Sequence, residues 1–269
     1  MTAFHMPAPF VLFTGGKGGV GKTACAANLG VHMAREKQRV LLVDLDLGLA
    51  NLNVLLRLTA RHNLEDALAG RVRFADCVVR GPEGVHVLPA GSGTAAMARD
   101  DAERRRLLLE GVAELAADYD FVIGDSAAGI GPDVLAFAAC ADLLLVVTTP
   151  DPTALTDAYG LVKALDAHAL EGDLEVPTPE LFVNLVDGVD EARETAAKLR
   201  AVCERFLARS PRMAGWLPRS RVIRAACGRQ RPFSVGDRNS LEYGCVRRLS
   251  ERVVRQFPGR REALSALKA

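Results

Sequence analysis

The sequence lacks the features that would carry a protein into or across a membrane. Although 49% of its 269 residues are apolar, no apolar run approaches the ~20 residues of a membrane-spanning helix. The N-terminal MTAFHMPAPF has no basic region followed by an apolar core, which a secretion signal requires. We therefore expect a cytoplasmic protein.

The cysteines lack the spacing of a metal site or a disulfide framework. There is no C-x-x-C pair, and no histidine stands at metal-ligand spacing from a cysteine. We expect buried, reduced thiols at all six positions. They are Cys25, Cys77, Cys140, Cys203, Cys227 and Cys245.

The length excludes two substantial domains but allows one large α/β core. We expect a single domain over residues 1–269, with a short extension at 1–9 and a tail at 258–269. Residues 1–190 carry 15 basic and 26 acidic side chains, whereas residues 191–269 carry 19 and 7. The basic C-terminal third indicates either an acidic partner surface or solvated arginine-rich helix faces, and the sequence leaves both open.

The stretch Gly15 to Thr23, GGKGGVGKT, carries the clearest chemistry. It follows the apolar run at 10–13, precedes a helical stretch at 24–36, and contains the pattern G-x-x-x-x-G-K-T. Glycines let backbone N–H groups converge on a triphosphate at the positive end of a helix. Lys22 would reach the β- and γ-phosphates, and Thr23 would ligate Mg²⁺. A merely flexible glycine-rich turn would not require this order of strand, loop and helix.

We predict that the loop binds phosphate through most of its residues. They are Gly16, Gly18, Gly19, Val20, Gly21, Lys22, Thr23 and Ala24. Phosphate binding alone does not require the second lysine, Lys17, so its charge needs another explanation.

Carboxylates follow two further buried strands. Strands that alternate with helical segments predict a parallel sheet with helices on both faces and an active site at the carboxyl ends. Asp44 ends the apolar run at 39–44, and Asp125 ends the run at 119–125. We predict that both belong to the Mg²⁺ shell and that Asp46 lies near an attacking water, while solvated loop carboxylates are the alternative.

Three other patterns give structural predictions. An amphipathic helix is expected over Ala102 to Ala117, with Arg104 to Arg106 facing outward. Another is expected over Thr153 to Leu165 with Thr153 as its cap, and Asp151 and Asp157 favour loop and capping roles over catalysis. His86, alternating with valines, is interpreted as a strand side chain and not a ligand.

Four of these motifs resemble the ParA/MinD family of ATPases. GKGGVGKT resembles its deviant Walker A motif, DLDLGLANLNVLL its first switch, and DSAAGIG its second switch. The run TTPDPTALTDAYGLVKAL is similar to the flagellar branch called FlhG or FleN. The resemblance covers about residues 10 to 257. It implies a three-layer P-loop NTPase fold with a mostly parallel central sheet.

The resemblance implies roles for single residues. Lys17 would reach the partner's phosphates across an ATP-sandwiched dimer, and Asp46 would position the hydrolytic water. Asn51, Asp125 and Gly129 would belong to the switches and the dimer face.

The adenine site is also given only by resemblance. Asn184 would recognise adenine, and Leu217 and Pro218 would belong to the loop that closes over the base. PAGSGT at 89–94 and RQRPF at 229–233 match two further family segments. The family's acidic residue two past this proline is replaced by Ser220, so the exact adenine contacts are not fixed.

For function, the resemblance implies a switch that binds ATP or ADP with Mg²⁺, forms an ATP-dependent homodimer and hydrolyses ATP slowly. In the flagellar branch the output is flagellar number or placement, through a transcriptional activator or an FlhF-like GTPase. The first ten residues contain no D-Q-A-x-x-L-R segment, so direct stimulation of such a GTPase is not expected from them.

Other functions on the same fold stay open. One is a MinD- or ParA-like division-site or DNA-partition ATPase, although we do not expect direct DNA binding. Another is a dethiobiotin-synthetase-like ligase or a nitrogenase-reductase-like electron carrier, for which Cys140 is the only cysteine near the second switch. In the tail, only Leu264 and Leu267 are large and apolar. We expect a docked or frayed tail, with peripheral contact at the inner membrane face or cell pole as the alternative.

Overall fold

The protein is built around one eight-stranded sheet with the strand order β3-β4-β2-β5-β1-β6-β7-β8. This computed structural model describes residues 6–48, 50–91, 102–172, 176–207 and 209–257. Every pairing in the sheet is parallel except β3 with β4. The strands are β1 Phe10–Gly15, β2 Val40–Leu45, β3 Val79–Arg80, β4 His86–Leu88, β5 Phe121–Ala128, β6 Leu143–Thr148, β7 Glu180–Val186 and β8 Met213–Pro218.

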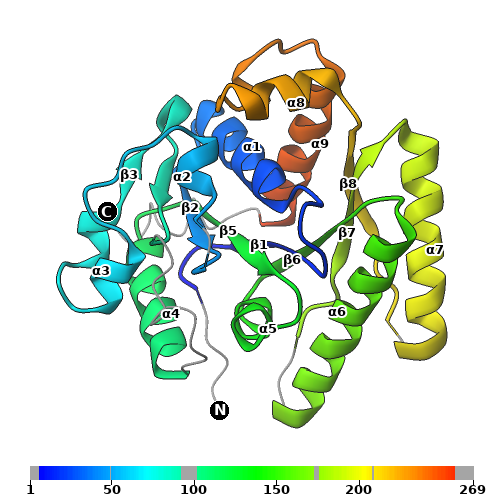
Figure 1. Cartoon of the computed structure of the whole chain (residues 1–269), viewed down its shortest axis with the longest axis horizontal. Coiled ribbons are helices and arrows are strands. Elements are labelled where there is room, and N and C mark those ends of the chain that lie inside the picture. Colours follow the sequence, from blue (N-terminus) through cyan, green and yellow to red (C-terminus); the bar gives the residue numbers. More distant parts are fainter. Residues whose placement is uncertain (1–5, 49, 92–101, 173–175, 208, 258–269) are drawn as a thin grey trace.

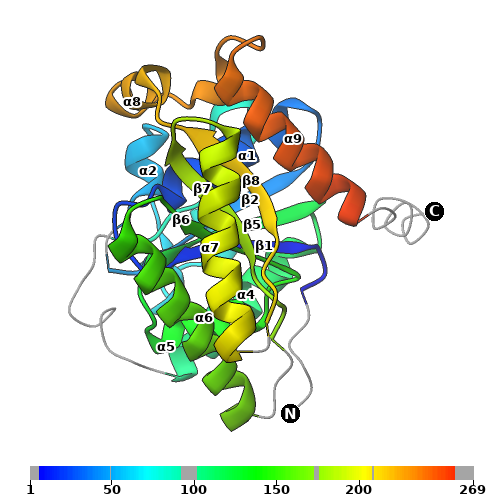
Figure 2. The ribbon, with the colours of Figure 1, turned by 90° about the vertical axis from the view of Figure 1, so that its right-hand side faces the viewer.

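The described helices are distributed over the two faces of this sheet (Figures 1 and 2). They are α1 Lys22–Arg35, α2 Leu52–Leu55, α3 Leu64–Leu68, α4 Ala102–Ala116, α5 Pro132–Ala139, α6 Pro152–Gly172, α7 Val189–Leu207, α8 Arg221–Gly228 and α9 Leu241–Gln256. Short 3₁₀ turns lie at η1 Phe74–Cys77, η2 Pro82–Gly84 and η3 Phe233–Val235.

Two hydrophobic cores explain why the central strands are apolar throughout. In β1, Phe10 and Leu12 face the core beneath α4, α5, α6 and α7, whereas Val11 and Phe13 face the core beneath α1 and α9. A strand covered on both faces has no solvent-facing side, so its sequence does not alternate. All six residues of β1, β2 and β6 are buried. The predicted three-layer fold is confirmed.

The structure corrects two local predictions. Arg104 does not face outward: it is buried, and its Nη2 lies 2.6 Å from Asp133 Oδ2, while Arg105 Nη1 lies 3.1 Å from Asp133 Oδ1. The helical pattern could not reveal this, because a partner in another helix decides which way an arginine turns. The cap of α6 is Asp151, whose Oδ1 accepts the N–H groups of Thr153 and Ala154 at 2.8 and 3.1 Å.

The structure describes some of the remaining predicted features, and others lie outside the described residues. All six cysteines are free thiols; Cys140 and Cys227 are half-buried and the other four are buried. His86 is a strand residue, as predicted, and its Nδ1 lies 2.7 Å from the Tyr119 hydroxyl. The tail at 258–269, residues 1–5 and the second half of PAGSGT lie outside the described residues. No described helix is both long enough and apolar enough to span a membrane.

Candidate nucleotide site

The glycine-rich loop connects β1 to α1 at the carboxyl edge of the sheet. Gly21 is the residue before the helix and has φ 95°, in the left-handed region that glycine adopts without strain. A Cβ on Gly21 would lie 2.2 Å from Asn184 Nδ2, and one on Gly16 would lie 2.1 Å from the carbonyl oxygen of Asp157. Neighbouring atoms therefore exclude side chains at two of the predicted loop glycines.

A cavity of about 730 Å³ opens beside this loop. Four segments that are distant in sequence line it: the loop and start of α1, the first switch, the second switch and the end of α8. The lining residues are Gly18, Gly19, Gly21, Lys22, Thr23, Ala24, Asp46, Asn51, Val54, Leu55, Ser126, Ala128, Cys227, Gly228 and Gln230. Of the predicted phosphate-binding residues, Gly16 and Val20 do not line it. Val20 is packed in the hydrophobic core and Gly16 lies against α6.

Two buried carboxylates lie side by side at the edge of this site. Asp44 and Asp125 are register partners on the adjacent parallel strands β2 and β5. Burial raises the pKa of Asp44 to about 6 and is the main reason that the pKa of Asp125 is raised to about 8, while repulsion from the Asp44 carboxylate adds to the increase at Asp125. Asp125 Oδ1 is buried and accepts no hydrogen bond from the described residues. A pair of this kind needs positive charge nearby.

Lys22 and Thr23 supply part of what the carboxylates need. Lys22 is only 8% exposed. Burial lowers the pKa of its amine, and attraction to Asp125 and Asp46 partly opposes that change. The Thr23 side chain hydrogen-bonds to Asp125 and lowers the pKa of that carboxyl group. The uncompensated Asp125 oxygen beside a threonine hydroxyl suits a hard divalent cation such as Mg²⁺, which prefers oxygen ligands.

Asp44 also organises the first switch. Its Oδ2 accepts the N–H groups of Asn51 and Leu52 at 2.9 and 3.0 Å, and its Oδ1 accepts the N–H of Asp46 at 3.2 Å. These bonds bring the loop back to the start of α2. They also place Asn51 Nδ2 3.5 Å from Asp46 Oδ2 at the cavity wall. The predicted metal role of Asp44 therefore stands beside a backbone-holding role that its position in the sequence did not indicate.

The second switch begins inside β5 and not after it. The strand continues to Ala128, so Asp125 lies within paired backbone. Gly129, with φ 101°, donates its N–H to the carbonyl of Gly15 at 3.0 Å. Ile130 follows with 55% of its surface exposed. The second switch is thus joined directly to the base of the glycine-rich loop.

Lys17 points away from the cavity within its own chain. Its Nζ lies 3.3 Å from Asp151 Oδ1 and also hydrogen-bonds to the Thr153 hydroxyl, at the first turn of α6. It does not line the cavity. The resemblance-based role of Lys17 in a partner's site stays a prediction, and it would require Lys17 to leave these contacts.

The predicted adenine residues lie behind the loop and not on the cavity wall. Asn184 is buried; its Nδ2 donates to the carbonyl of Val20 at 2.8 Å and its Oδ1 accepts the N–H of Leu185 at 2.9 Å. Leu217 and Pro218 are buried at the end of β8. The described contacts give Asn184 a role in holding the loop, and adenine recognition by these three residues stays a prediction.

The end of α8 is a part of the site that sequence reasoning missed. Cys227, Gly228 and Gln230 line the cavity although none was predicted to bind nucleotide. The resemblance of RQRPF marked this element as a family segment, but nothing in the pattern shows that it folds back over α1. Ser220, noted as a departure, caps α8 by accepting the Val222 N–H at 3.0 Å, and it donates to the buried Glu242.

Comparison with known proteins supports the same family. An AAA domain model matches residues 10–172. The antiactivator FleN of Pseudomonas aeruginosa is 37% identical over 231 residues, which are 86% of this chain and 80% of FleN. The flagellum site-determining protein YlxH of Helicobacter pylori is 32% identical over 74% of this chain and 65% of its own length.

Structural comparison agrees at the level of the fold. The septum site-determining protein MinD of Pyrococcus horikoshii OT3, solved with Mg-ADP, superposes with a TM-score of 0.75 at 24% identity, over 91% of this chain and 96% of that chain. At this identity the likeness supports the fold alone. The family model and the long match to FleN go further, and on their strength the chain belongs to the ParA/MinD family of P-loop ATPases.

Proposed function

We propose that the protein is an ATP-hydrolysing, dimerising switch that regulates flagellar number or placement. The observation that carries the nucleotide part is the register pairing of Asp44 with Asp125 next to Lys22 and Thr23. The flagellar part is supported by the match to FleN, named an antiactivator, and to the flagellum site-determining YlxH.

In this mechanism the loop amides, Lys22 and Thr23 bind the phosphates of ATP or ADP. Thr23, Asp125 and Asp44 would hold Mg²⁺, which neutralises phosphate charge when bound. Asp46, on the cavity wall, orients the attacking water. Gly129 lets the second switch change conformation when the terminal phosphate is lost.

Dimerisation gives Lys17 its function. ATP draws Lys17 from Asp151 toward the phosphates of a second copy, where it stabilises the charge of the transition state. Asn51 and the exposed Ile130 lie at the face that the second copy covers. Closure of the dimer then presents a surface to a flagellar transcriptional activator or assembly factor. The slow rate of hydrolysis sets how long that surface lasts.

The replacement Lys17→Ala tests this mechanism. We expect it to retain binding of a fluorescent ADP analogue but to lose ATP-dependent dimerisation and at least about tenfold in hydrolysis rate. Lys163→Ala, an exposed lysine of α6, is the matched control. Sedimentation with ADP and with ATP measures the dimer, and phosphate release measures hydrolysis. A Lys17→Ala chain that still dimerises and hydrolyses normally would exclude the mechanism.

The partner is tested with Asp46→Ala, which should accumulate the ATP-bound dimer. We expect this variant to co-purify a flagellar activator from its own cells more than the wild-type chain does. Capture of a division inhibitor would favour a MinD-like function. Salt-sensitive binding to plain DNA would favour a partition function. We place the protein in the cytoplasm, with the inner membrane face or the cell pole as sites to examine by microscopy.

A further inference from the structure

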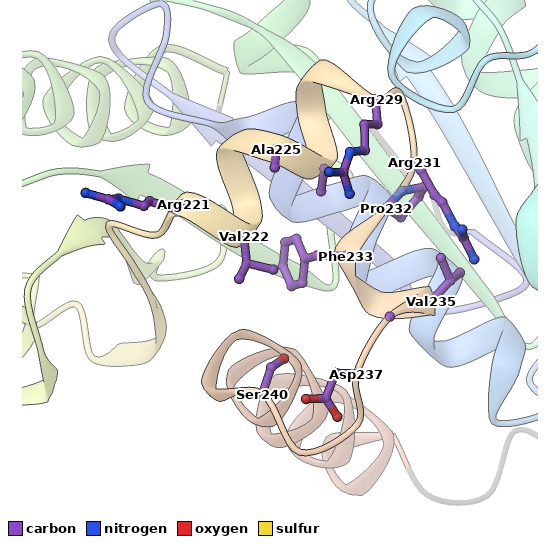
Figure 3. Close-up of a pocket in the computed structure, with 12 residues that line it drawn as sticks. Arg221, Val222, Ala225, Arg229, Arg231, Pro232, Phe233, Val235, Asp237 and Ser240 are labelled. Carbon is purple, nitrogen blue, oxygen red and sulfur yellow. The ribbon is translucent and has the colours of Figure 1, made fainter.

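A second hollow lies beside α8, on the side away from the nucleotide cavity. It encloses about 510 Å³ between α8, the segment 229–237 and the first residues of α9. Figure 3 shows the side chains of Val222 of α8 and Phe233 of η3 side by side, with Asp237 and Ser240 below them in the view. We call this hollow the arginine groove, lined by Arg221, Val222, Ala225, Ala226, Arg229, Arg231, Pro232, Phe233, Val235, Gly236, Asp237 and Ser240.

The floor of the arginine groove is apolar and partly uncovered. Val222 is 50% exposed, whereas Phe233 is 5% exposed. Val222 is one of the large apolar side chains that the described structure leaves open to water. Gathered apolar surface beside polar residues is typical of a binding site and not of ordinary protein surface.

The rim of the groove is basic. Arg221, Arg229 and Arg231 contribute three guanidinium groups, all on exposed residues, and Asp237 is the single carboxylate in the lining. Among the described residues, none of these arginines forms an ion pair with a carboxylate. By contrast, Arg247 on α9 has Glu251 at 3.8 Å. The groove therefore combines an apolar floor with unneutralised positive charge.

We propose that the arginine groove docks an acidic amphipathic segment of a partner protein. Apolar side chains of that segment would pack against Val222 and the neighbouring apolar lining, and its carboxylates would meet the arginines on the rim. A concave apolar floor suits a peptide better than a flat lipid surface. The chain's own last twelve residues carry three basic side chains and one acidic side chain, so the arginines on the rim would repel them.

The groove also shares its wall with the nucleotide cavity. Residues of one continuous segment alternate between the two: Cys227, Gly228 and Gln230 line the nucleotide cavity, whereas Ala226, Arg229 and Arg231 line the groove. No residue of α8 is fully buried, so little packing holds this helix in one position. A change at the nucleotide can therefore shift the groove, and groove and nucleotide affinities should be coupled reciprocally.

Selection of random twelve-residue peptides displayed on phage, against the whole purified chain, tests the groove without nucleotide. We expect enriched peptides with Asp or Glu between Leu, Ile or Phe at helical spacing. Val222→Glu should weaken their binding about tenfold or more, because it places a carboxylate on the apolar floor. The double replacement Arg229→Glu and Arg231→Glu should weaken it similarly, and more strongly at low salt.

Two controls separate the groove from general basicity. Arg200→Glu, an exposed arginine of α7 that lines neither cavity, should leave peptide binding unchanged. Enrichment of basic peptides, no enrichment at all, or binding as sensitive to Arg200→Glu as to Val222→Glu would overturn the proposal. Binding of phosphatidylglycerol vesicles that Val222→Glu abolishes, with no peptide enriched, would make the occupant a membrane and would also overturn it.

The coupling between the groove and the nucleotide cavity is measured separately. It is the only part of the proposal that rests on the proposed nucleotide function. The affinity of a selected peptide should differ about fivefold or more between the ADP-bound and ATP-bound chains. The peptide should change the ratio of ADP to ATP affinity by the same factor. Equal peptide affinity in both states would overturn the coupling. A chain that binds peptide but no ATP would contradict the proposed function and leave the groove in place.

Discussion

The nucleotide cavity and the arginine groove lie on two sides of one segment, yet they are built differently. The cavity is lined by left-handed glycines and a lysine that is 8% exposed, and two buried carboxylates lie at its edge. The groove is formed by exposed arginines around Val222, which is half-exposed, and Phe233, which is buried. The geometry of the nucleotide cavity restricts which amino acid can occupy each position. The arginine groove restricts only the charge and the polarity of its residues. Specific chemistry is therefore readable from sequence in one region and not in the other.

The largest expected effect concerns the ion pair between α4 and α5, the helix that follows the second switch. We expect Arg104→Ala to lower the free energy of unfolding by about 2 kcal/mol, because it removes a buried charged hydrogen bond and leaves Asp133 paired with Arg105 alone. Arg106→Ala on the same helix removes exposed ion pairs with Glu103 and Glu110 and should cost much less. Urea denaturation measures both. Equal losses for the two variants would contradict the distinction.

A substitution within the loop tests how strictly the cavity is specified. Gly21→Ala forces a residue with φ 95° to carry a Cβ 2.2 Å from Asn184 Nδ2. We expect about 2 kcal/mol of strain and at least a tenfold loss of nucleotide affinity, measured by titration with a fluorescent ADP analogue. Gly160→Ala on α6 meets no atom within 4 Å, does not line the cavity and is the matched control. Similar affinities for the two variants would show that the backbone geometry is not what binds nucleotide.

Acid should act on the helix that joins the two regions. Asn28 and Arg35 of α1 bond to Ser234, and His32 packs edge-on against Tyr243 at 5.0 Å. Burial is the main cause of the lowered pKa of His32. Glu36 and Glu251 oppose this change, whereas Arg35 and Arg247 lower the pKa further. Burial also lowers the pKa of His86. In the unfolded chain both titrate near the ordinary value of about 6.5.

Each histidine therefore binds a proton more readily in the unfolded state than in the folded state. The contribution of the two histidines to stability should be full above about pH 6.5 and should fall as the pH drops, by up to about 1.4 kcal/mol per pH unit for each histidine. The raised pKa values of Asp44 and Asp125 act in the opposite direction, so the histidine contribution is measured as the difference between the wild-type chain and the His32 variant. Thermal unfolding at a series of pH values measures this slope. His32→Phe should reduce the slope, because it removes the buried imidazole. A slope unchanged by His32→Phe would contradict the assignment.

The smallest expected effect belongs to the groove. Val222→Glu should change the free energy of unfolding by no more than about 0.5 kcal/mol, because Val222 is already half-exposed. Leu217→Ala, at a buried position in β8, should lower the free energy of unfolding by about 2 kcal/mol or more and provides the contrast. Urea denaturation of the two variants provides the test. A large loss in Val222→Glu would mean that this side chain belongs to the core.

What the sequence could predict follows the same division. The loop, both switch carboxylates and the parallel sheet were predictable because each depends on residue types that few alternatives satisfy. The inward orientation of Arg104 in α4 was not predictable, because it depends on an ion pair with Asp133 in α5. Nor was the return of 227–230 to the cavity, because that depends on how α8 packs. Asn184 was identified by resemblance, but its bond to Val20 could be seen only in three dimensions.

The position of Gly16 has a consequence for how the site can be influenced from outside. There is no room for even a methyl group between Gly16 and the carbonyl of Asp157, so the glycine-rich loop rests directly on the backbone of α6. The same helix is capped by Asp151, which forms an ion pair with Lys17. A displacement of α6 would therefore be transmitted directly to the backbone of the loop at Gly16, at a point that does not line the nucleotide cavity.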